Sequence, residues 1–301
     1  MYILELILGR LLSSSNYYNG EKKLTGGRNG YGAKLANIYS HEFTIETVDK
    51  NTQQKYKQTW TNNMSVCGKA KITKNARGEE YTRVTFRPDL ERFGMDRIDD
   101  DTAGLLRNRV YDMAGTVKDV KVFLNDEHLK IKNFKQYVEM YLQSAQDGAA
   151  ESSGGASRPK QSLIYEQISG RWEVAFAVSE GTFQFVSFAN SISTTKGGTH
   201  VAYLPDQIAK NLVAAISKNK AATVKPAQIK NHMWLFVNCL IENPIFDSQT
   251  KETLTSPVSK FGSKPTLSED FLKESMCSIH PNCSAPIIAL QFGNPLSSIT
   301  S

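Results

Sequence analysis

The sequence predicts an α+β protein with antiparallel or mixed sheets and with helices packed on a sheet face. Two observations predict this class. Alternating apolar and polar residues, typical of strands, recur in two groups of segments, and helix-like periodicity occurs around them. The 301 residues are 40% hydrophobic and 22% charged, which is enough apolar material for two ordinary domains.

The first half carries both patterns. Helical periodicity predicts helices over residues 3–12, 34–40, 99–115 and 133–143. β-Branched and aromatic residues in alternation predict strands at 42–49, 56–63 and 81–88. Two further short strands are expected within 119–131, on either side of an Asn-Asp turn.

The second half repeats the combination. Strands are predicted at residues 163–168, 171–178 and 182–191. A helix is predicted from Pro205, a residue suited to a first helical turn, to Lys218. Periodicity alone leaves residues 232–243 open as a buried strand or a helix.

Composition places the domain boundaries. We expect one domain over residues 1–132 and a second over 133–276, with a flexible loop at 144–160 where small and polar residues dominate. Residues 277–301 do not extend the preceding helical pattern, and we expect a divergent, disordered tail there.

Charge and cysteine content limit the function classes. The net charge of +6 permits a polyanionic partner such as nucleic acid, but an ordinary protein that is merely basic fits equally well. The four cysteines have no C-x-x-C spacing and the five histidines form no ligand cluster with them, so neither a zinc site nor a disulfide framework is expected. No apolar run is long enough for a membrane span.

The stretch "TGGRNGYGAK" at residues 25–34 holds four glycines, an arginine and a lysine. It lacks the order of a P-loop, because Leu35 stands where the hydroxyl residue belongs. It also lacks the glycine order and the preceding strand of a dinucleotide-binding turn. Uncovered backbone N–H groups beside cationic side chains still favour an anion. The residues alone leave phosphate binding and a structural turn as alternatives.

Several long segments together resemble one family. "LLSSSNY" and "KKLTGGRNGYGAKLANIYS" are followed in order by "YDMAGTVKDVKVFLN", "RWEVAFAVSEGTFQFVSFANSISTTKGGTHV", "KNHMWLFVNCLIENPIFDSQTKETL" and "FGSKPTLSEDFL". These segments resemble the ATPase region of the eukaryotic type II DNA topoisomerases over about residues 3–276. The resemblance implies the C-terminal part of a GHKL-type ATPase α/β sandwich, followed by a ribosomal-protein-S5-like transducer domain.

The resemblance implies ATP as the bound nucleotide and assigns its phosphate contacts. Those of the Gly-rich segment would come from Gly27, Arg28, Asn29, Gly30, Tyr31, Gly32, Ala33 and Lys34. Ser14, Ser15 and Asn16 match the family's Ser-Ser-Asn, which contacts ribose and phosphates. By themselves, these three residues would equally suit a polar loop at a helix end.

The resemblance also assigns a switch loop and a DNA contact. In "DSQTK", Gln249 and Lys251 would reach the γ-phosphate, and Lys251 would neutralise charge as the bond breaks. Thr250 would be a further nucleotide-binding residue. Lys218, Asn219 and Lys220 resemble a basic patch that contacts the phosphates of double-stranded DNA. Without the family, both segments would be interpreted as solvated surface. His200 and His232 have no acidic or cysteine partner at ligand spacing and are interpreted as structural.

The other half of the family's ATP site is not expected in this chain. Its general-base Glu, its Mg²⁺-binding Asn and its adenine-reading Asp precede the segment matched here, and we find no metal ligands to replace them. Glu5 has Gly9 four residues later, where the Asn would be needed. We therefore expect weak or absent nucleotide binding and no ATP hydrolysis by this chain alone.

Three hypotheses remain open at this stage. In the first, the chain is part of an ATP-driven enzyme that passes one DNA duplex through another. In the second, it is a diverged DNA- or subunit-binding module without ATPase activity. In the third, it is a remnant that folds poorly. The resemblance also implies a nuclear location and a homodimer. We do not expect this chain alone to form a stable dimer.

Overall fold

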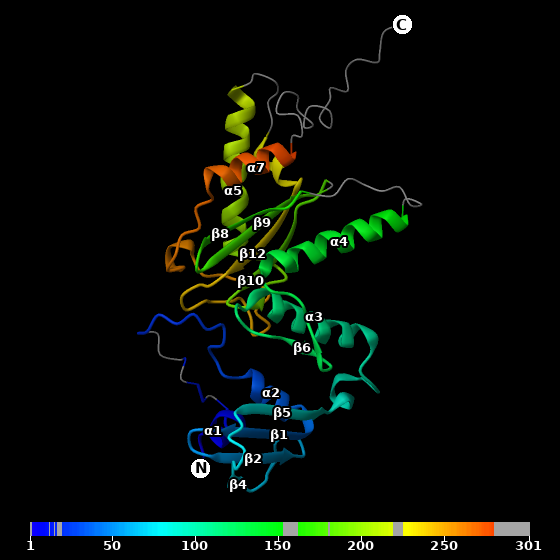
Figure 1. Ribbon diagram of the computed structural model, residues 1–301, viewed down its shortest axis with the longest axis vertical. Coiled ribbons are helices and arrows are strands. Elements are labelled where there is room, and N and C mark those ends of the chain that lie inside the picture. The colour runs from blue at the N-terminus through cyan, green and yellow to red at the C-terminus, as the bar shows by residue number, and fades with distance from the viewer. Residues whose placement is uncertain are drawn as a thin grey trace. The chain divides into compact units, whose positions relative to one another are not determined.

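The computed structural model describes residues 2–11, 13–14, 16, 20–152, 162–179, 181–218 and 225–279 (Figure 1). The chain divides into two compact units, of which the first comprises Met1–Glu21 with Gly27–Leu105. The second comprises Lys22–Gly26 with Leu106–Ser301. The units therefore divide within a helix at Leu105, whereas the sequence placed a domain boundary at residue 132; that boundary stays a prediction.

The first unit is built on an antiparallel sheet. Its main strands are β1 (Ser40–Asp49), β2 (Gln54–Thr61) and β5 (Tyr81–Pro88), which confirm the three predicted strands. Two short strands, β3 (Val66–Cys67) and β4 (Lys71–Lys74), pair with β2 and were not predicted. The strand order is β3-β2-β1-β5. Because β3 and β4 are exposed, they carry no alternation that would reveal them.

Two short helices cover the apolar face of this sheet. They are α1 (Ile3–Gly9) and α2 (Gly32–Ile38). Phe43 and Trp60 are paired across β1 and β2, so their side chains lie on one face, where Leu8 of α1 packs. Helix α1 ends at Gly9, three residues before its predicted end, since glycine is a poor helix former. Its backbone approaches the Trp60 indole so closely that an added Cβ would lie 3.0 Å from Nε1.

Helical segments connect the first sheet to the second. A 3₁₀ turn (Leu90–Phe93) is followed by α3 (Asp100–Thr116), near its predicted position. The Asp99 carboxylate accepts a hydrogen bond from the Thr102 backbone N–H at 2.7 Å, as expected at a helix start. Strands β6 (Phe123–Leu124) and β7 (Glu127–His128) form the small predicted hairpin.

The second unit contains a mixed five-stranded sheet of order β11-β10-β12-β9-β8. Its strands are β8 (Ile164–Ser169), β9 (Trp172–Val178), β10 (Gln184–Ala189), β11 (Ile192–Ser193) and β12 (Met233–Cys239). Only the β10–β12 pair is parallel. The segment that periodicity left open is therefore the central strand β12, buried on both faces.

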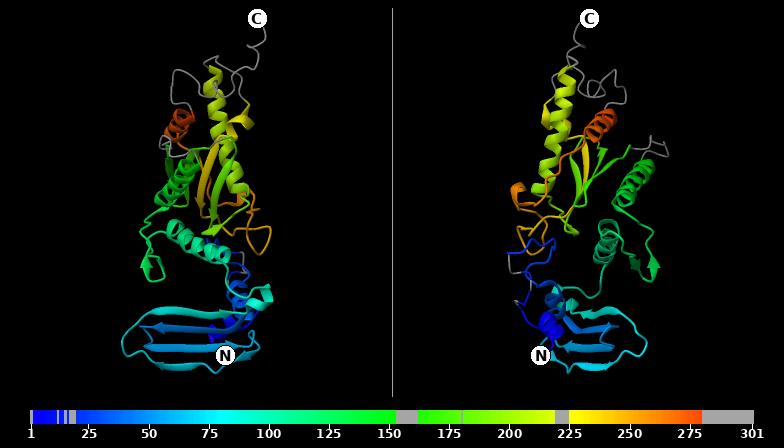
Figure 2. Two further views of the ribbon diagram at one scale, coloured as in Figure 1. Left: turned by 90° about the vertical axis from the view of Figure 1, so that its right-hand side faces the viewer. Right: turned by 60° about the vertical axis from the view of Figure 1, so that its left-hand side comes forward.

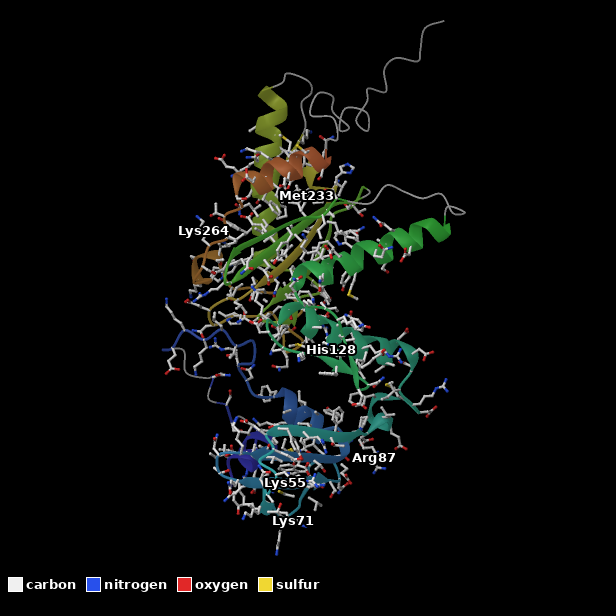
Figure 3. All side chains as sticks on the ribbon, in the orientation of Figure 1. Lys55, Lys71, Arg87, His128, Met233 and Lys264 are labelled. Carbon is white, nitrogen blue, oxygen red and sulfur yellow. The ribbon has the colours of Figure 1, made fainter. Side chains whose placement is uncertain are left out.

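Helices cover both faces of this sheet, as the two views of Figure 2 show. One face carries α5 (Thr199–Lys218), α6 (Pro226–Lys230) and α7 (Glu269–Ile279), whose apolar residues share a core with Val174 and Leu235. The opposite face packs against α4 (Phe134–Ser152), through Ala175 and Phe236. Met233, labelled in Figure 3, begins β12 and is fully buried in the first of these cores.

Three sequence expectations in this unit were wrong at their boundaries. Helix α4 runs to Ser152, so the predicted loop at 144–160 is helical in its first half; residues 153–161 lie outside the described part. Alanine is the best helix former, and three of the nine residues over 144–152 are alanine. Helix α7 extends to Ile279, past the predicted end of the domain at 276, and residues 280–301 are not described.

The third wrong boundary is the start of α5, which begins at Thr199 and not at Pro205. The Thr199 backbone N–H donates to the Leu254 carbonyl at 3.1 Å, and its hydroxyl donates to Ser256 O at 2.7 Å. These contacts fix the first turn ahead of the proline. Among the described helices, none combines the length and apolar content that a membrane span requires.

A buried carboxylate fastens the end of α3 to the second sheet. Glu173 on β9 accepts hydrogen bonds from the Tyr165 hydroxyl at 2.6 Å and from the Asn238 amide at 3.0 Å. The same amide nitrogen lies 3.3 Å from the Thr116 carbonyl, and the Lys118 ammonium lies 3.6 Å from the carboxylate. A buried charge needs such partners, so the Glu173 cluster holds Thr116 and Lys118, at the end of α3, against the second sheet.

Two glycines of α3 give a matched test of this packing. A Cβ at Gly115 would lie 2.4 Å from the Tyr137 ring, whereas a Cβ at Gly104 would meet nothing within 4 Å. Gly115→Ala should therefore lower the free energy of unfolding by about 1–3 kcal/mol, and Gly104→Ala should raise it by up to about 1 kcal/mol. Urea unfolding of the two variants measures both. Equal effects would contradict the packing of α3 against α4.

Candidate nucleotide-phosphate site

The Gly-rich loop forms a tight structure within the first unit. Gly30 has a φ of +65°, and a Cβ there would lie 2.8 Å from the Ser13 carbonyl and 3.1 Å from the Lys34 ammonium. Glycine is therefore needed both for the backbone conformation and for the close approach. Gly27 and Gly32 have open space around them, so a phosphate oxygen can reach their backbone.

Lys34 lies under this loop. Its side chain is carried by the first turn of α2, its residue is 1% exposed, and its ammonium donates a hydrogen bond to the Ser13 carbonyl at 2.7 Å. Burial lowers the pKa of this ammonium. A buried ammonium with a neutral partner is stabilised by any anion that approaches it.

The polar segment before the loop contacts the loop directly. The Asn16 side-chain amide donates to the Gly27 carbonyl at 2.8 Å, and the Asn16 backbone N–H donates to the Ser14 hydroxyl at 3.1 Å. The structure thus brings Ser14, Asn16, Gly27 and Lys34 together; their contacts with a nucleotide stay a prediction. Ser15 lies outside the described residues.

The remaining predicted residues of the Gly-rich loop are partly or fully exposed to solvent. Asn29 and Ala33 are exposed, and Arg28 and Tyr31 are half-buried. Helix α2 has only seven residues, so its dipole adds little, and the anion-binding character of the loop comes from its backbone and from Lys34.

The predicted switch loop lies in the second unit, over residues 247–253. It is closed by hydrogen bonds between Asp247 and Thr253, and within it Ser248 and Thr250 join their hydroxyls at 2.8 Å. Gln249 and Thr250 are exposed. Their side chains are therefore accessible to a ligand.

Lys251 ends the turn in a left-handed conformation, with a φ of +61°. Its ammonium donates to the Gly26 carbonyl at 3.1 Å, and burial lowers its pKa. Gly26 lies in the Gly-rich stretch, directly before the predicted phosphate contacts at 27–34, and belongs to the second unit with Lys251. Sequence reasoning named Lys251 but missed this contact and the residues that fix Gly26, because no local pattern marks them.

The structure leaves two parts of the prediction untested. Of the DNA-binding candidates, only the backbone of Lys218 is described, at the end of α5, and Asn219 and Lys220 lie outside the described residues. Within the described part, no three His, Cys, Asp or Glu side chains gather as metal ligands. The described residues of the two loops offer backbone N–H groups and ammonium groups to a phosphate.

Comparison with known proteins identifies the family of the chain. The family model for DNA gyrase B matches residues 133–281. DNA topoisomerase 2 of Meyerozyma guilliermondii is 55% identical over 272 residues, covering 88% of this chain and 19% of the relative. DNA topoisomerase 2 of Saccharomyces cerevisiae is 53% identical over 285 residues, covering 92% and 20%.

Solved structures show the same relationship. The ATPase region of Saccharomyces cerevisiae topoisomerase II superposes with a TM-score of 0.82 at 52% identity, covering 92% of this chain and 68% of that one. The ATPase and transducer domains of DNA topoisomerase II from Balamuthia mandrillaris give the same TM-score and coverage at 44% identity. The chain spans about a fifth of the length of the curated relatives it matches. It belongs to the type II DNA topoisomerase family, in which it corresponds to part of the ATPase region.

Proposed function

We propose that this chain supplies the phosphate contacts of the ATP site in a type II DNA topoisomerase, which uses ATP to pass one DNA duplex through another. The hydrogen bond from the Lys251 ammonium to the carbonyl of Gly26 supports the proposal most directly, because it ties the switch lysine to the residue before the Gly-rich loop. The comparisons give no support to the alternative of a binding module without ATPase activity.

Within this proposal, the Gly-rich loop and Lys34 bind the triphosphate. The backbone N–H groups of the loop donate to phosphate oxygens, as in other anion-binding loops. The Lys34 ammonium, held at the Ser13 carbonyl, gains a full counter-charge when a phosphate approaches. The Asn16 amide keeps the start of the loop in place through Gly27.

Lys251 acts on the bond that breaks. As the γ-phosphate separates, negative charge develops on its oxygens and on the leaving group, and a nearby ammonium stabilises that charge. Burial lowers the pKa of Lys251, and the triphosphate would raise it again by favouring the charged form. Its turn is closed by the Asp247–Thr253 hydrogen bonds, so the ammonium is positioned before the reaction begins.

Double-stranded DNA and a second copy of the protein are the partners that this function needs, and both are part of the proposal. The net charge of +6 is compatible with a DNA partner. The region around Lys218 would contact DNA phosphates without regard to sequence.

A chimeric enzyme tests the ATP role. Residues 2–279 replace the matching segment of Saccharomyces cerevisiae DNA topoisomerase 2, and DNA-stimulated ATP hydrolysis is measured. The chimera should be active, and Lys251→Ala should lower its kcat by about 100-fold or more. Lys260→Ala removes an exposed lysine of the same unit and serves as the control. Undiminished ATP hydrolysis in the Lys251→Ala chimera would contradict the proposal.

Salt dependence tests the DNA role in the chain itself. Replacing Lys218 and Lys220 by alanine should weaken duplex binding and reduce the slope of log K against log salt concentration by about 2, because each lysine that contacts a phosphate contributes about 0.9. Fluorescence anisotropy of a labelled duplex at several salt concentrations gives the slope. The Lys260→Ala/Lys264→Ala double variant has the same charge change, and an equal loss in both variants would refute a specific patch.

A further inference from the structure

The residues that precede the Gly-rich loop are bound along the second unit. We call Lys22–Gly26 the root strip. The Lys23 backbone N–H donates to the Asn243 side-chain oxygen at 3.3 Å, and the Asn243 backbone N–H donates to the Lys23 carbonyl at 2.9 Å. One asparagine therefore pairs with both the backbone N–H and the backbone carbonyl of Lys23. It has a φ of +43°, a conformation that asparagine tolerates better than most residues.

A charged cluster supports the same end of the strip. The Glu242 carboxylate lies 3.3 Å from the Lys22 ammonium and accepts a hydrogen bond from Arg171 at 2.9 Å. Its other side packs against Gly262, where an added Cβ would lie 2.1 Å from the carboxyl carbon. The Glu242 backbone N–H donates to Phe261 at 3.1 Å. The side chain and the backbone of Glu242 are therefore fixed, but the Lys22 side chain is 79% exposed, so this ion pair adds little to the hold on the strip.

The far end of the strip is held by close packing. Gly26 is buried, and a Cβ there would lie 2.2 Å from the Ile192 side chain and 3.2 Å from the Asn190 carbonyl. The Asn190 side chain exchanges two hydrogen bonds with the Ile241 backbone, at 2.9 and 2.8 Å, so this wall is itself rigid. The Gly26 carbonyl accepts the hydrogen bond from the Lys251 ammonium.

The groups that hold the two ends of the strip come from one stretch of chain. Glu242, Asn243 and Lys251 lie within ten consecutive residues. Hydrogen bonds between Ile245 and Thr255, and between Asp247 and Thr253, close this stretch on itself. Any displacement of the strip from Asn243 therefore changes where Gly26 lies relative to Lys251.

We propose that Asn243 is a positioning residue for the ATP reaction, because it holds the root strip, which ends at Gly26, beside the switch lysine. The chain leaves the second unit at Gly26 and enters the first at Gly27, so the root strip ends at the residue that precedes the predicted phosphate contacts. This role rests on the proposed function of Lys251 and extends it to a residue that touches neither the nucleotide nor the reacting atoms.

Hydrogen exchange of the 301-residue chain tests the docking without nucleotide. Asn243→Gly keeps the left-handed backbone accessible and removes the side-chain acceptor, while Asn243→Asp keeps an acceptor oxygen. Amide exchange in peptides covering residues 20–27 should become about fivefold faster in the glycine variant and return toward wild type in the aspartate variant. Asn125 has a φ of +50° in an exposed turn, so Asn125→Gly is the matched control. Unchanged exchange in Asn243→Gly would overturn the proposal.

The chimeric enzyme tests the positioning. Asn243→Gly should lower kcat by about tenfold with a smaller change in KM, and Asn243→Asp should restore most of the loss. Faster exchange with unchanged kcat would overturn the positioning role. Undiminished turnover in the Lys251→Ala chimera identifies a failure of the ATP function itself and overturns the positioning role with it, while the exchange experiment still reports on the docking.

Discussion

The hydrogen bond between the Lys251 ammonium and the Gly26 carbonyl is the constraint on which the site depends. It joins residues separated by 225 positions, and it does so at the last residue before the phosphate loop. A Cβ there would lie 2.2 Å from the Ile192 side chain, so a larger residue would displace that side chain. Within the second unit, this contact fixes Gly26 beside Lys251, and Gly27 follows in the chain.

The second unit provides the rigidity that this constraint needs. Its sheet is covered by α5 and α7 on one face and by α4 on the other, and β9 and β12 are almost completely buried. The Glu173 carboxylate is held in this interior by the Tyr165 hydroxyl and the Asn238 amide. The switch loop is carried at the margin of this scaffold, which is where functional loops are commonly positioned.

Patterns within short stretches of sequence predicted the strands and the Gly-rich loop, whose structure depends on neighbouring residues. Alternation located β1, β2 and β5, and the glycine spacing marked the loop that Lys34 and Gly30 now explain. The family resemblance supplied Lys251, which no pattern in the residues would have selected. Composition alone misassigned the end of α4, because alanine and serine suit a helix as well as a linker. The contact of Lys23 with Asn243 spans 220 residues and leaves no trace in local sequence.

The most direct test of the account is a cryo-electron microscopy structure of the chimeric enzyme with a non-hydrolysable ATP analogue. The account predicts the Lys251 ammonium about 3 Å from a γ-phosphate oxygen, with both hydrogen bonds between Lys23 and Asn243 still in place. A structure in which Lys251 points away from the triphosphate, or in which the root strip has separated from Asn243, would contradict it.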